Sequence, residues 1–389
     1  MLLKPELDAE DIGALNRFAM AFGQLLREVR IDRYETPLNR SAEKAATVEH
    51  LRRGISYNPQ FEYPRNDLDR ERGAIEQLAA PVVPWFDDIC SRELELLRGE
   101  LAAAAAHSPT QITHASVARY GPPRSALVDD ALKVLSAPSL DTGDDFNDVA
   151  RTSSMAAAAE IQRVITELGL DGWTAVEVPD TPARMSVSGA EQIVRIRAGE
   201  LFTRAELNRL LVHEIGTHVF RAVNGSRQPI QLLQFGLLDY QSTEEGLAVF
   251  HESERGLLRP ADLQKYALRL VIADRALQGA SFADLLTILL DYVAFDQAFD
   301  IAARAKRGFE DTAQPGCHVK DQVYFSGYRD VSRFLSRYPD SKKTLMMGKV
   351  SIDFVDWLES WRGSGVLRAP DLDVQRVDAA IRLTTSDGE

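Results

Sequence analysis

The feature that most constrains how this chain can fold is the sequence HEIGTH at residues 213–218, which sets two histidines five residues apart. Imidazole is the commonest metal ligand among side chains, and a glutamate beside such a histidine is the usual general base of zinc hydrolases. The familiar zinc-peptidase motif places its histidines four residues apart, so one extra residue separates them here. Any fold of this chain must therefore bring two imidazoles to a common site from an unusual helical spacing.

The sequence around the motif predicts a long buried helix. Thr203 and Glu206 have the spacing of a capping box, and Phe202 and Leu207 occupy the flanking staple positions. Leucine, valine and isoleucine then leave almost no polar face before the motif, and Asn224-Gly225 is a good stop signal. The motif thus lies in the second half of the helix, among the apolar neighbours that a metal site needs.

The spacing of the histidines predicts a local distortion of this helix. Each residue of a straight helix turns about 100°, so positions five apart point about 140° away from each other and could not both reach one ion. A π-type bulge would bring His213 and His218 to one side, and such bulges cluster at functional sites. Gly216 is the residue that would ease the distortion. The alternative of two unrelated helix histidines is disfavoured, because polar groups in so apolar a helix need partners.

A catalytic zinc site needs a third protein ligand and an open position for water. The segment STEEGLAVFHE at 242–252 starts like a second helix, with Ser242 or Thr243 as its cap. We predict Glu245 as the third ligand. The alternatives, each of which would otherwise be a solvated or surface residue, are Glu244, Glu252 and His251.

The combination of HEIGTH with EEGLA at 244–248 resembles the tubulin tyrosine carboxypeptidase (MATCAP-like) metallopeptidases. Bacterial relatives of that family are described as flavohemoglobin expression-modulating QEGLA motif proteins, and this chain has Glu244 where their motif has Gln. Three more segments resemble motifs of the family: NPQFEY at 58–63, Arg307-Gly308, and KDQVYFSG at 320–327. The resemblance spans about residues 35 to 335. The five-residue histidine spacing with a later Glu-Glu pair also occurs in dipeptidyl peptidase III.

The resemblance implies a gluzincin-like zinc peptidase with one Zn²⁺ per chain, held by His213, His218 and Glu245. Water takes the fourth position, and Glu214 accepts its proton and passes it to the leaving amine. The reaction implied is that of a carboxypeptidase, which removes a C-terminal residue, possibly aromatic, such as tyrosine, from a peptide or protein.

Polar residues in the last motif and in the segment before it supply candidates for the remaining roles. The donors that would stabilise the oxyanion are Tyr324, Lys320 and His318. A carboxypeptidase also needs a cation to bind the terminal carboxylate, and we predict Lys320 and Arg307 for this role. The alternative is that these cations only decorate the end of a helix.

Two other functions fit the same motifs. One is an endopeptidase or dipeptidyl-peptidase with the same zinc chemistry. The other is a non-catalytic regulator that keeps the metal for stability, although a structural zinc site would have no need of the base Glu214.

The composition disfavours several other classes of protein. The net charge is −13, which counts against nucleic acid and anionic membrane surfaces, because proteins that bind phosphate normally carry a basic balance or stripe. No run approaches the ~18 apolar residues of a membrane span, and the first residues lack the apolar core of a signal peptide. Cys90 and Cys317 do not have CxxC spacing, so a disulfide framework is not expected. We expect a cytoplasmic protein without nucleic-acid or membrane partners, and the sequence leaves its oligomeric state open.

The order of the predicted elements indicates an α+β fold that is mainly helical, with a small sheet beside the zinc-binding helix. The predicted strands are Thr174–Val178, Met185–Val187 and Ile193–Ile196, with a turn at residues 188–191. Zinc peptidases often bind a substrate as an added strand at such an edge; the alternative is a purely structural hairpin.

Helical patterns fill most of the remaining chain. Before the sheet, a first helix is predicted from the apolar spacing of residues 12–26, and further patterns run at about 40–54, 66–79, 83–106, 124–137 and 155–168. Behind the EEGLA segment they run at Ala261–Gln278, Ser281–Ala303, Tyr328–Tyr338 and Val350–Leu358, with a loop at Gly308–Cys317. Taking the polar break at Asp141–Asp148 as a boundary, we predict an N-terminal helical region (1–150), a catalytic zinc metallopeptidase domain (151–335) and a C-terminal helical extension (336–389).

Overall fold

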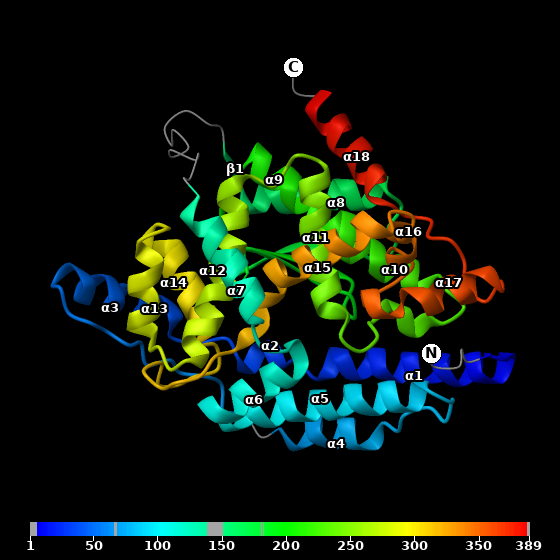
Figure 1. Ribbon diagram of the computed structural model, residues 1–389, viewed down its shortest axis with the longest axis horizontal. Helices are drawn as coiled ribbons and strands as arrows, with labels where there is room; N and C mark the ends of the chain where they lie inside the picture. Colours follow the sequence, from blue (N-terminus) through cyan, green and yellow to red (C-terminus); the bar gives the residue numbers. More distant parts are fainter. Residues whose placement is uncertain (1–5, 66–67, 138–150, 180, 182, 387–389) are drawn as a thin grey trace.

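The computed structural model describes residues 6–65, 68–137, 151–179, 181 and 183–386. Helices make up most of this part of the chain, and two small sheets accompany them (Figure 1). The prediction of a mainly helical α+β fold is therefore confirmed. None of the helices in the described ranges has the length and apolar character needed to cross a membrane.

The helices before residue 138 follow the predicted pattern, except that the short helix at 31–34 and the longer one at 109–120 were not predicted. They are α1 (Ala9–Glu28), α2 (Ile31–Tyr34), α3 (Arg40–Arg52), α4 (Asp69–Gln77), α5 (Phe86–Ala106), α6 (Pro109–Tyr120) and α7 (Ser125–Ser136). Helix α6 was not predicted, although its signal is present: Ser108 caps the helix and Pro109 opens it. Helices α1, α4 and α5 run side by side along one edge of the molecule (Figure 1).

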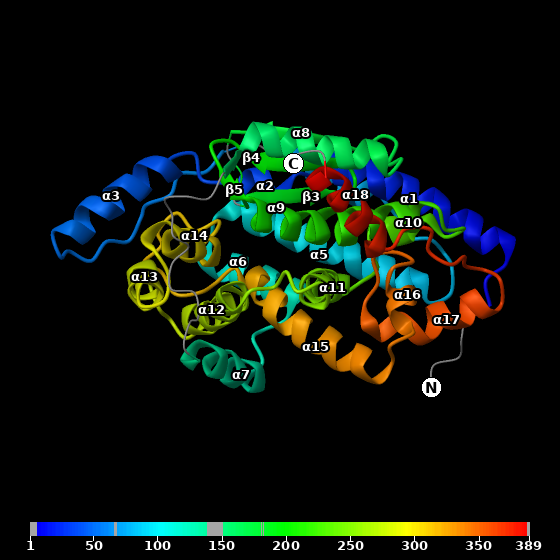
Figure 2. The same ribbon diagram turned by 90° about the horizontal axis from the view of Figure 1, so that it is seen from above.

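The predicted sheet lies between two helices. Strands β2 (Thr174–Val178), β3 (Met185–Ser188) and β4 (Ile193–Arg197) have the order β2-β4-β3, with β2 parallel and β3 antiparallel to β4. Helix α8 (Ser154–Glu167) covers one side, and the helix with the HEIGTH motif packs against β3 (Figure 2). Strand β3 is thus an edge strand beside the motif.

A second, two-stranded sheet leads into the motif helix. Strand β1 (Arg151–Ser153) pairs antiparallel with β5 (Leu201–Thr203), and neither strand was predicted. The capping box of Thr203 and Glu206 is confirmed and starts α9 (Arg204–Leu210) directly after β5. The helix continues as η1 (Leu211–Val219) and α10 (Phe220–Ser226). The helix ends at Ser226, one residue after the predicted stop at Asn224-Gly225, and Gly225 makes room for the main chain of Leu233.

The rest of the chain is helical. Its elements are η2 (Gln231–Gln234), α11 (Tyr240–Glu254), α12 (Pro260–Leu277), α13 (Phe282–Leu290), α14 (Phe295–Ala305), η3 (Val319–Gln322), α15 (Val323–Arg337), α16 (Ser341–Leu345), η4 (Ile352–Phe354), α17 (Val355–Gly363) and α18 (Val374–Ser386). The prediction of continuous helix over 281–303 was wrong: α13 stops at Leu290, and extended backbone at Ala294 starts α14 in a new direction. Its apolar periodicity continues through the break and so conceals it.

The described core consists mainly of two clusters of buried side chains. One cluster joins α1 and α5 to α8, the sheet and the motif helix, and it includes Phe22, Ile161 and Ile215. The other joins α7 to α11–α15 and includes Leu268 and Phe299. The motif helix therefore lies within a core shared by distant parts of the chain.

The division into regions 1–150, 151–335 and 336–389 stays a prediction, because the expected boundary at Asp141–Asp148 lies outside the described residues. Contacts run between the three regions. Helix α7 of the N-terminal region packs against α12 of the predicted catalytic region. Helix α18 of the C-terminal region packs against η1 of the same catalytic region.

Two glycines of the EGLA and KDQVYFSG motifs bring α11 and α15 into backbone contact. A Cβ atom at Gly246 would overlap the main chain of Gly327, and one at Gly327 would overlap the carbonyl of Ser242. Glu245 directly precedes the first glycine, and Tyr324 lies about one turn before the second. The crossing therefore fixes these two side chains relative to each other.

We expect Gly246→Ala to lower the free energy of unfolding by about 3 kcal/mol, the upper end of the usual cost of overpacking, because a methyl group would meet backbone atoms that cannot rotate away. Urea denaturation followed by circular dichroism measures this loss. Gly99→Ala is the matched control: Gly99 also lies within a helix, but in open space, so the change should stabilise by about 0.5–1 kcal/mol. A Gly246→Ala protein as stable as the parent would contradict the packing argument.

Candidate metal centre

The predicted distortion of the motif helix is confirmed. Residues Leu211–Val219 form a π-helix whose nine residues are all buried. Its wider turn brings His213 and His218 together, with their ring centroids 4.9 Å apart. Gly216 lies in this turn, where a Cβ atom would come 3.0 Å from Val374 Cγ2 of α18. The glycine therefore also allows α18 to pack against the motif.

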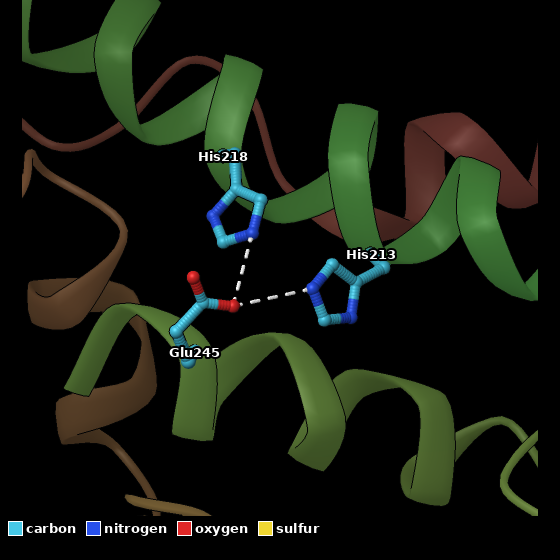
Figure 3. A group of neighbouring side chains, drawn as sticks. All are labelled: His213, His218 and Glu245. Atoms are coloured by element: carbon cyan, nitrogen blue, oxygen red, sulfur yellow. Dashed lines mark ion pairs between the residues drawn. The ribbon is translucent and has the colours of Figure 1, made fainter. Parts of the chain in front are cut away.

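Helix α11 places Glu245 opposite the two histidines (Figure 3). Glu245 Oε2 lies 3.4 Å from His213 Nε2 and 3.5 Å from His218 Nε2. One ligand atom from each of the three residues lies within 4.8 Å of the others, and no other such group of metal-binding side chains occurs among the described residues. Glu245 Oε2 is buried without a hydrogen-bond partner, so this oxygen has the environment of a metal ligand.

The three alternative ligands take other positions. Glu252 Oε1 lies 2.7 Å from His213 Nδ1, and Glu244 Oε1 lies 2.9 Å from His218 Nδ1. Both carboxylates therefore accept from the far side of an imidazole and orient its Nε2, as carboxylates commonly do in zinc sites. His251 is hydrogen-bonded to Thr217 through Nδ1.

A cavity of about 190 Å³ opens beside the centre. It is lined by His213, Glu214 and Tyr324, by Met185 at the start of the edge strand β3, and by several cationic side chains. These are Arg184, Arg209, Lys265, Arg269 and Arg304. Of the three predicted ligands, His213 lines this cavity.

Glu214 reaches this cavity without a partner. Its carboxylate forms no hydrogen bond or ion pair with any described residue. Burial raises the pKa of Glu214, although the neighbouring His213 and His218 oppose the shift. A carboxylate with a raised pKa is a better proton acceptor than an ordinary one.

Tyr324 forms one wall of the site. Its ring stacks on His213 at a centroid distance of 6.2 Å and on Tyr266 at 5.4 Å. The guanidinium of Arg269 covers the ring at 4.8 Å. Burial raises the pKa of Tyr324, so the hydroxyl keeps its proton and can donate it in a hydrogen bond.

Lys320 and Arg307 have different surroundings. The amine of Lys320 forms no hydrogen bond or ion pair with any described residue. Burial and Arg307 lower its pKa, whereas the charge of Glu245 raises it, so the amine lies within electrostatic range of the centre. The Nε of Arg307 lies 3.3 Å from Glu35 Oε2, and its guanidinium also contacts His318, with Nη2 2.9 Å from the ring Nδ1.

His318 is buried between Arg307, Glu35 and the ring of Tyr120. No contact joins it to His213, His218 or Glu245 within the described ranges. Tyr324 thus lines the cavity, and Lys320 lies close enough to Glu245 to interact with its charge. Arg307 and His318 form a neighbouring cluster.

Sequence reasoning missed several residues of the site. Arg209 and Tyr266 both bond to Glu252, and Arg221 bonds to Glu244. The two arginines had a detectable signal, because each lies three or four residues from a motif histidine on the same helix. Tyr266 and Glu35 had none, since only the tertiary fold brings them to the site.

Similarity to known proteins covers most of the chain. The family model described as "Microtubule-associated tyrosine carboxypeptidase" matches residues 49–385. Over 189 residues the chain is 36% identical to microtubule-associated tyrosine carboxypeptidase 1 of Mus musculus, which covers 46% of this chain and 40% of that protein. Over 166 residues it is 40% identical to the Homo sapiens protein of the same name, covering 41% and 34%. A putative tyrosine carboxypeptidase of Homo sapiens is 34% identical over 169 residues, covering 42% and 32%. The aligned part is thus less than half the length of each of these relatives.

Proposed function

The chain belongs to the microtubule-associated tyrosine carboxypeptidase family, and on this premise we propose that it is a zinc-dependent carboxypeptidase. Its substrate is the C-terminus of a peptide or protein. The observation that carries the proposal is the meeting of His213, His218 and Glu245, with His213 lining a cavity that Glu214 also lines.

The three predicted ligands fit one Zn²⁺ ion. Two imidazole nitrogens and one carboxylate oxygen form the donor set of many zinc hydrolases. The buried Glu245 Oε2 lacks a hydrogen-bond partner, and both imidazoles are oriented by carboxylates on their far side. Zn²⁺ bound there would supply a Lewis acid that polarises a carbonyl and lowers the pKa of water.

Glu214 acts as the general base in this proposal. Its unpaired carboxylate lies beside His213 at the cavity, where it accepts a proton from the attacking water. The same carboxyl group then gives this proton to the amine of the departing residue. Burial keeps the carboxylate weakly solvated and so favours its proton-bound form after the first transfer.

Tyr324 donates a hydrogen bond to the oxyanion that forms on the scissile carbonyl. Its ring is held between His213 and Tyr266, so its hydroxyl is already oriented before substrate binds. Lys320 and His318 were the other candidates for this role. His318 has an indirect role in this proposal, because its ring contacts Arg307 and does not line the cavity.

Lys320 binds the terminal carboxylate of the substrate. Its amine has no partner among the described side chains, and a half-buried cation without a counter-ion favours an anionic ligand. Arg307 adds positive charge beside it and is itself held by Glu35. The preceding residues of the substrate pair with the free edge of β3, whose first residue, Met185, lines the cavity. The residue released is aromatic, in line with the tyrosine in the names of the relatives.

The experiment that tests this function compares a peptide ending in Tyr with its C-terminally amidated twin. The parent enzyme should cleave the free acid much faster, because only the free acid can pair with Lys320. Lys320→Met should lower kcat/KM on the free acid by about 10- to 100-fold, which corresponds to one charge-assisted hydrogen bond of roughly 1.5–3 kcal/mol.

Lys342→Met is the matched control, since Lys342 pairs with Glu254 on the surface. Its kcat/KM should equal that of the parent. If the parent cleaves acid and amide equally, recognition of the terminal carboxylate is excluded, and the function is that of an endopeptidase.

A further inference from the structure

The side chain of Arg221 is completely buried one turn after His218. Its guanidinium is held on three sides. Nε donates to Leu345 O at 2.9 Å, Nη2 donates to Val350 O at 2.8 Å, and Nη1 donates to Glu244 Oε2. Two of the three hydrogen bonds are thus accepted by carbonyl groups of one main-chain segment, residues 345–350, which we call the clasp.

Glu244 is the link between Arg221 and the metal centre. Its Oε2 accepts from Arg221, and its Oε1 lies 2.9 Å from His218 Nδ1. Lys349 of the clasp also approaches Oε1, with its Nζ at 3.4 Å. Because Arg221 binds Oε2, the carboxylate of Glu244 is held with Oε1 facing both the imidazole and Lys349.

The other histidine has a similar but more open arrangement. Glu252, which orients His213, accepts hydrogen bonds from Arg209 and from the hydroxyl of Tyr266. Arg209 and Tyr266 line the cavity, so a bound substrate can reach them. Arg221 is fully enclosed. The orientation of His218 therefore depends on the interior of the fold and not on the substrate.

We propose that Arg221 is a positioning residue of the metal centre, which acts on His218 through Glu244, and that the clasp is therefore part of this centre. The inference rests on the proposed function only in that His213, His218 and Glu245 must bind the metal. An orienting carboxylate fixes the tautomer of its histidine and makes the imidazole a stronger ligand, and its loss typically weakens metal binding about 10- to 100-fold.

The test measures metal binding by the full chain with Arg221→Met, which removes the charge at nearly constant volume. Competition with a chromophoric chelator gives the Kd for Zn²⁺, and the visible spectrum of the Co²⁺-loaded protein reports the ligand geometry. We expect the Kd for zinc to rise about 10- to 100-fold, together with an altered cobalt spectrum. A folded Arg221→Met protein with the Kd and the cobalt spectrum of the parent would overturn the proposal.

Arg119→Met is the matched control. Arg119 is also buried and pairs with two carboxylates, Glu93 and Glu100, which have no contact with the metal centre. This change should reduce stability, because it leaves buried charges without a partner. It should leave the Kd for zinc and the cobalt spectrum unchanged. An equal loss of zinc affinity in both variants would show that Arg221 acts only through the overall stability of the fold, and it would refute the proposal.

If Arg221→Met does not fold, the double variant Glu244→Gln with Arg221→Met tests the proposal in its place. It removes both members of the buried ion pair and keeps an amide oxygen for His218. Zinc binding about 10-fold weaker than in the parent is expected, and parental affinity would overturn the proposal. A parent that binds zinc but cleaves no peptide would contradict the proposed function alone. A parent that binds neither metal would refute both.

Discussion

Glu214→Gln should lower kcat for peptide hydrolysis by about 10²–10⁴-fold, the usual contribution of a general base. The amide has nearly the same shape as the carboxyl group but cannot accept a proton from water. Since Glu214 has no partner among the described residues, the change breaks no contact. Initial rates on a peptide ending in Tyr, with zinc content measured in the same samples, give the result.

The stability of this variant separates a catalytic role from a structural one. Burial raises the pKa of Glu214, so at neutral pH its charge opposes folding. That penalty applies above the ordinary pKa of a glutamate and disappears as the pH falls and the group is protonated. Metal-free Glu214→Gln protein should therefore be at least as thermostable as the parent at pH 7, which thermal unfolding with a chelator measures. Full activity, or a large drop in Tm, would be incompatible with Glu214 as the base.

Glu245→Ala should abolish stoichiometric zinc binding and peptidase activity together. It removes one of three predicted ligands, so the loss of affinity should exceed the ~10–100-fold expected for an orienting carboxylate. Elemental analysis after dialysis and competition with a chelator measure zinc binding, and initial rates on a peptide ending in Tyr measure activity.

Glu244→Ala is the comparison that makes the result specific. Glu244 is adjacent in sequence but contacts His218 at Nδ1, the nitrogen that faces away from the centre. This variant should keep weakened but measurable zinc binding. If Glu245→Ala retained zinc and Glu244→Ala lost it, the ligand would be the neighbouring residue and the assignment would be wrong.

The parts of the fold that the sequence predicted well are those with local causes. The capping box at Thr203, the π-turn implied by the histidine spacing and the hairpin at 185–197 all depend on residues close in sequence. The break between α13 and α14 escaped prediction, because nothing in its apolar pattern distinguishes one long helix from two short ones.

The surroundings of the site could be predicted only in part, for a different reason. Glu244, Glu245 and Glu252 were all plausible ligands, because sequence cannot tell which oxygen faces which nitrogen. That choice depends on how α11 packs against η1, and on Gly246 and Gly327, which let the helices approach. Glu35 lies far away in sequence from Arg307, and their pairing exists only in the folded chain.

The proposed pairing of the substrate with the outer edge of β3 implies selection by the conformation of the substrate. A chain segment that pairs with an edge strand must be fully extended, at about 3.3 Å per residue, and must offer its main-chain N–H and C=O groups. A C-terminus that ends in a helix or is anchored to its own domain would first have to unravel, and this cost would add to the activation barrier. The enzyme would therefore favour proteins whose last residues unfold easily, whatever the side chains of those residues. Two substrates with identical final residues would be processed at rates that differ with the local unfolding free energy of their tails.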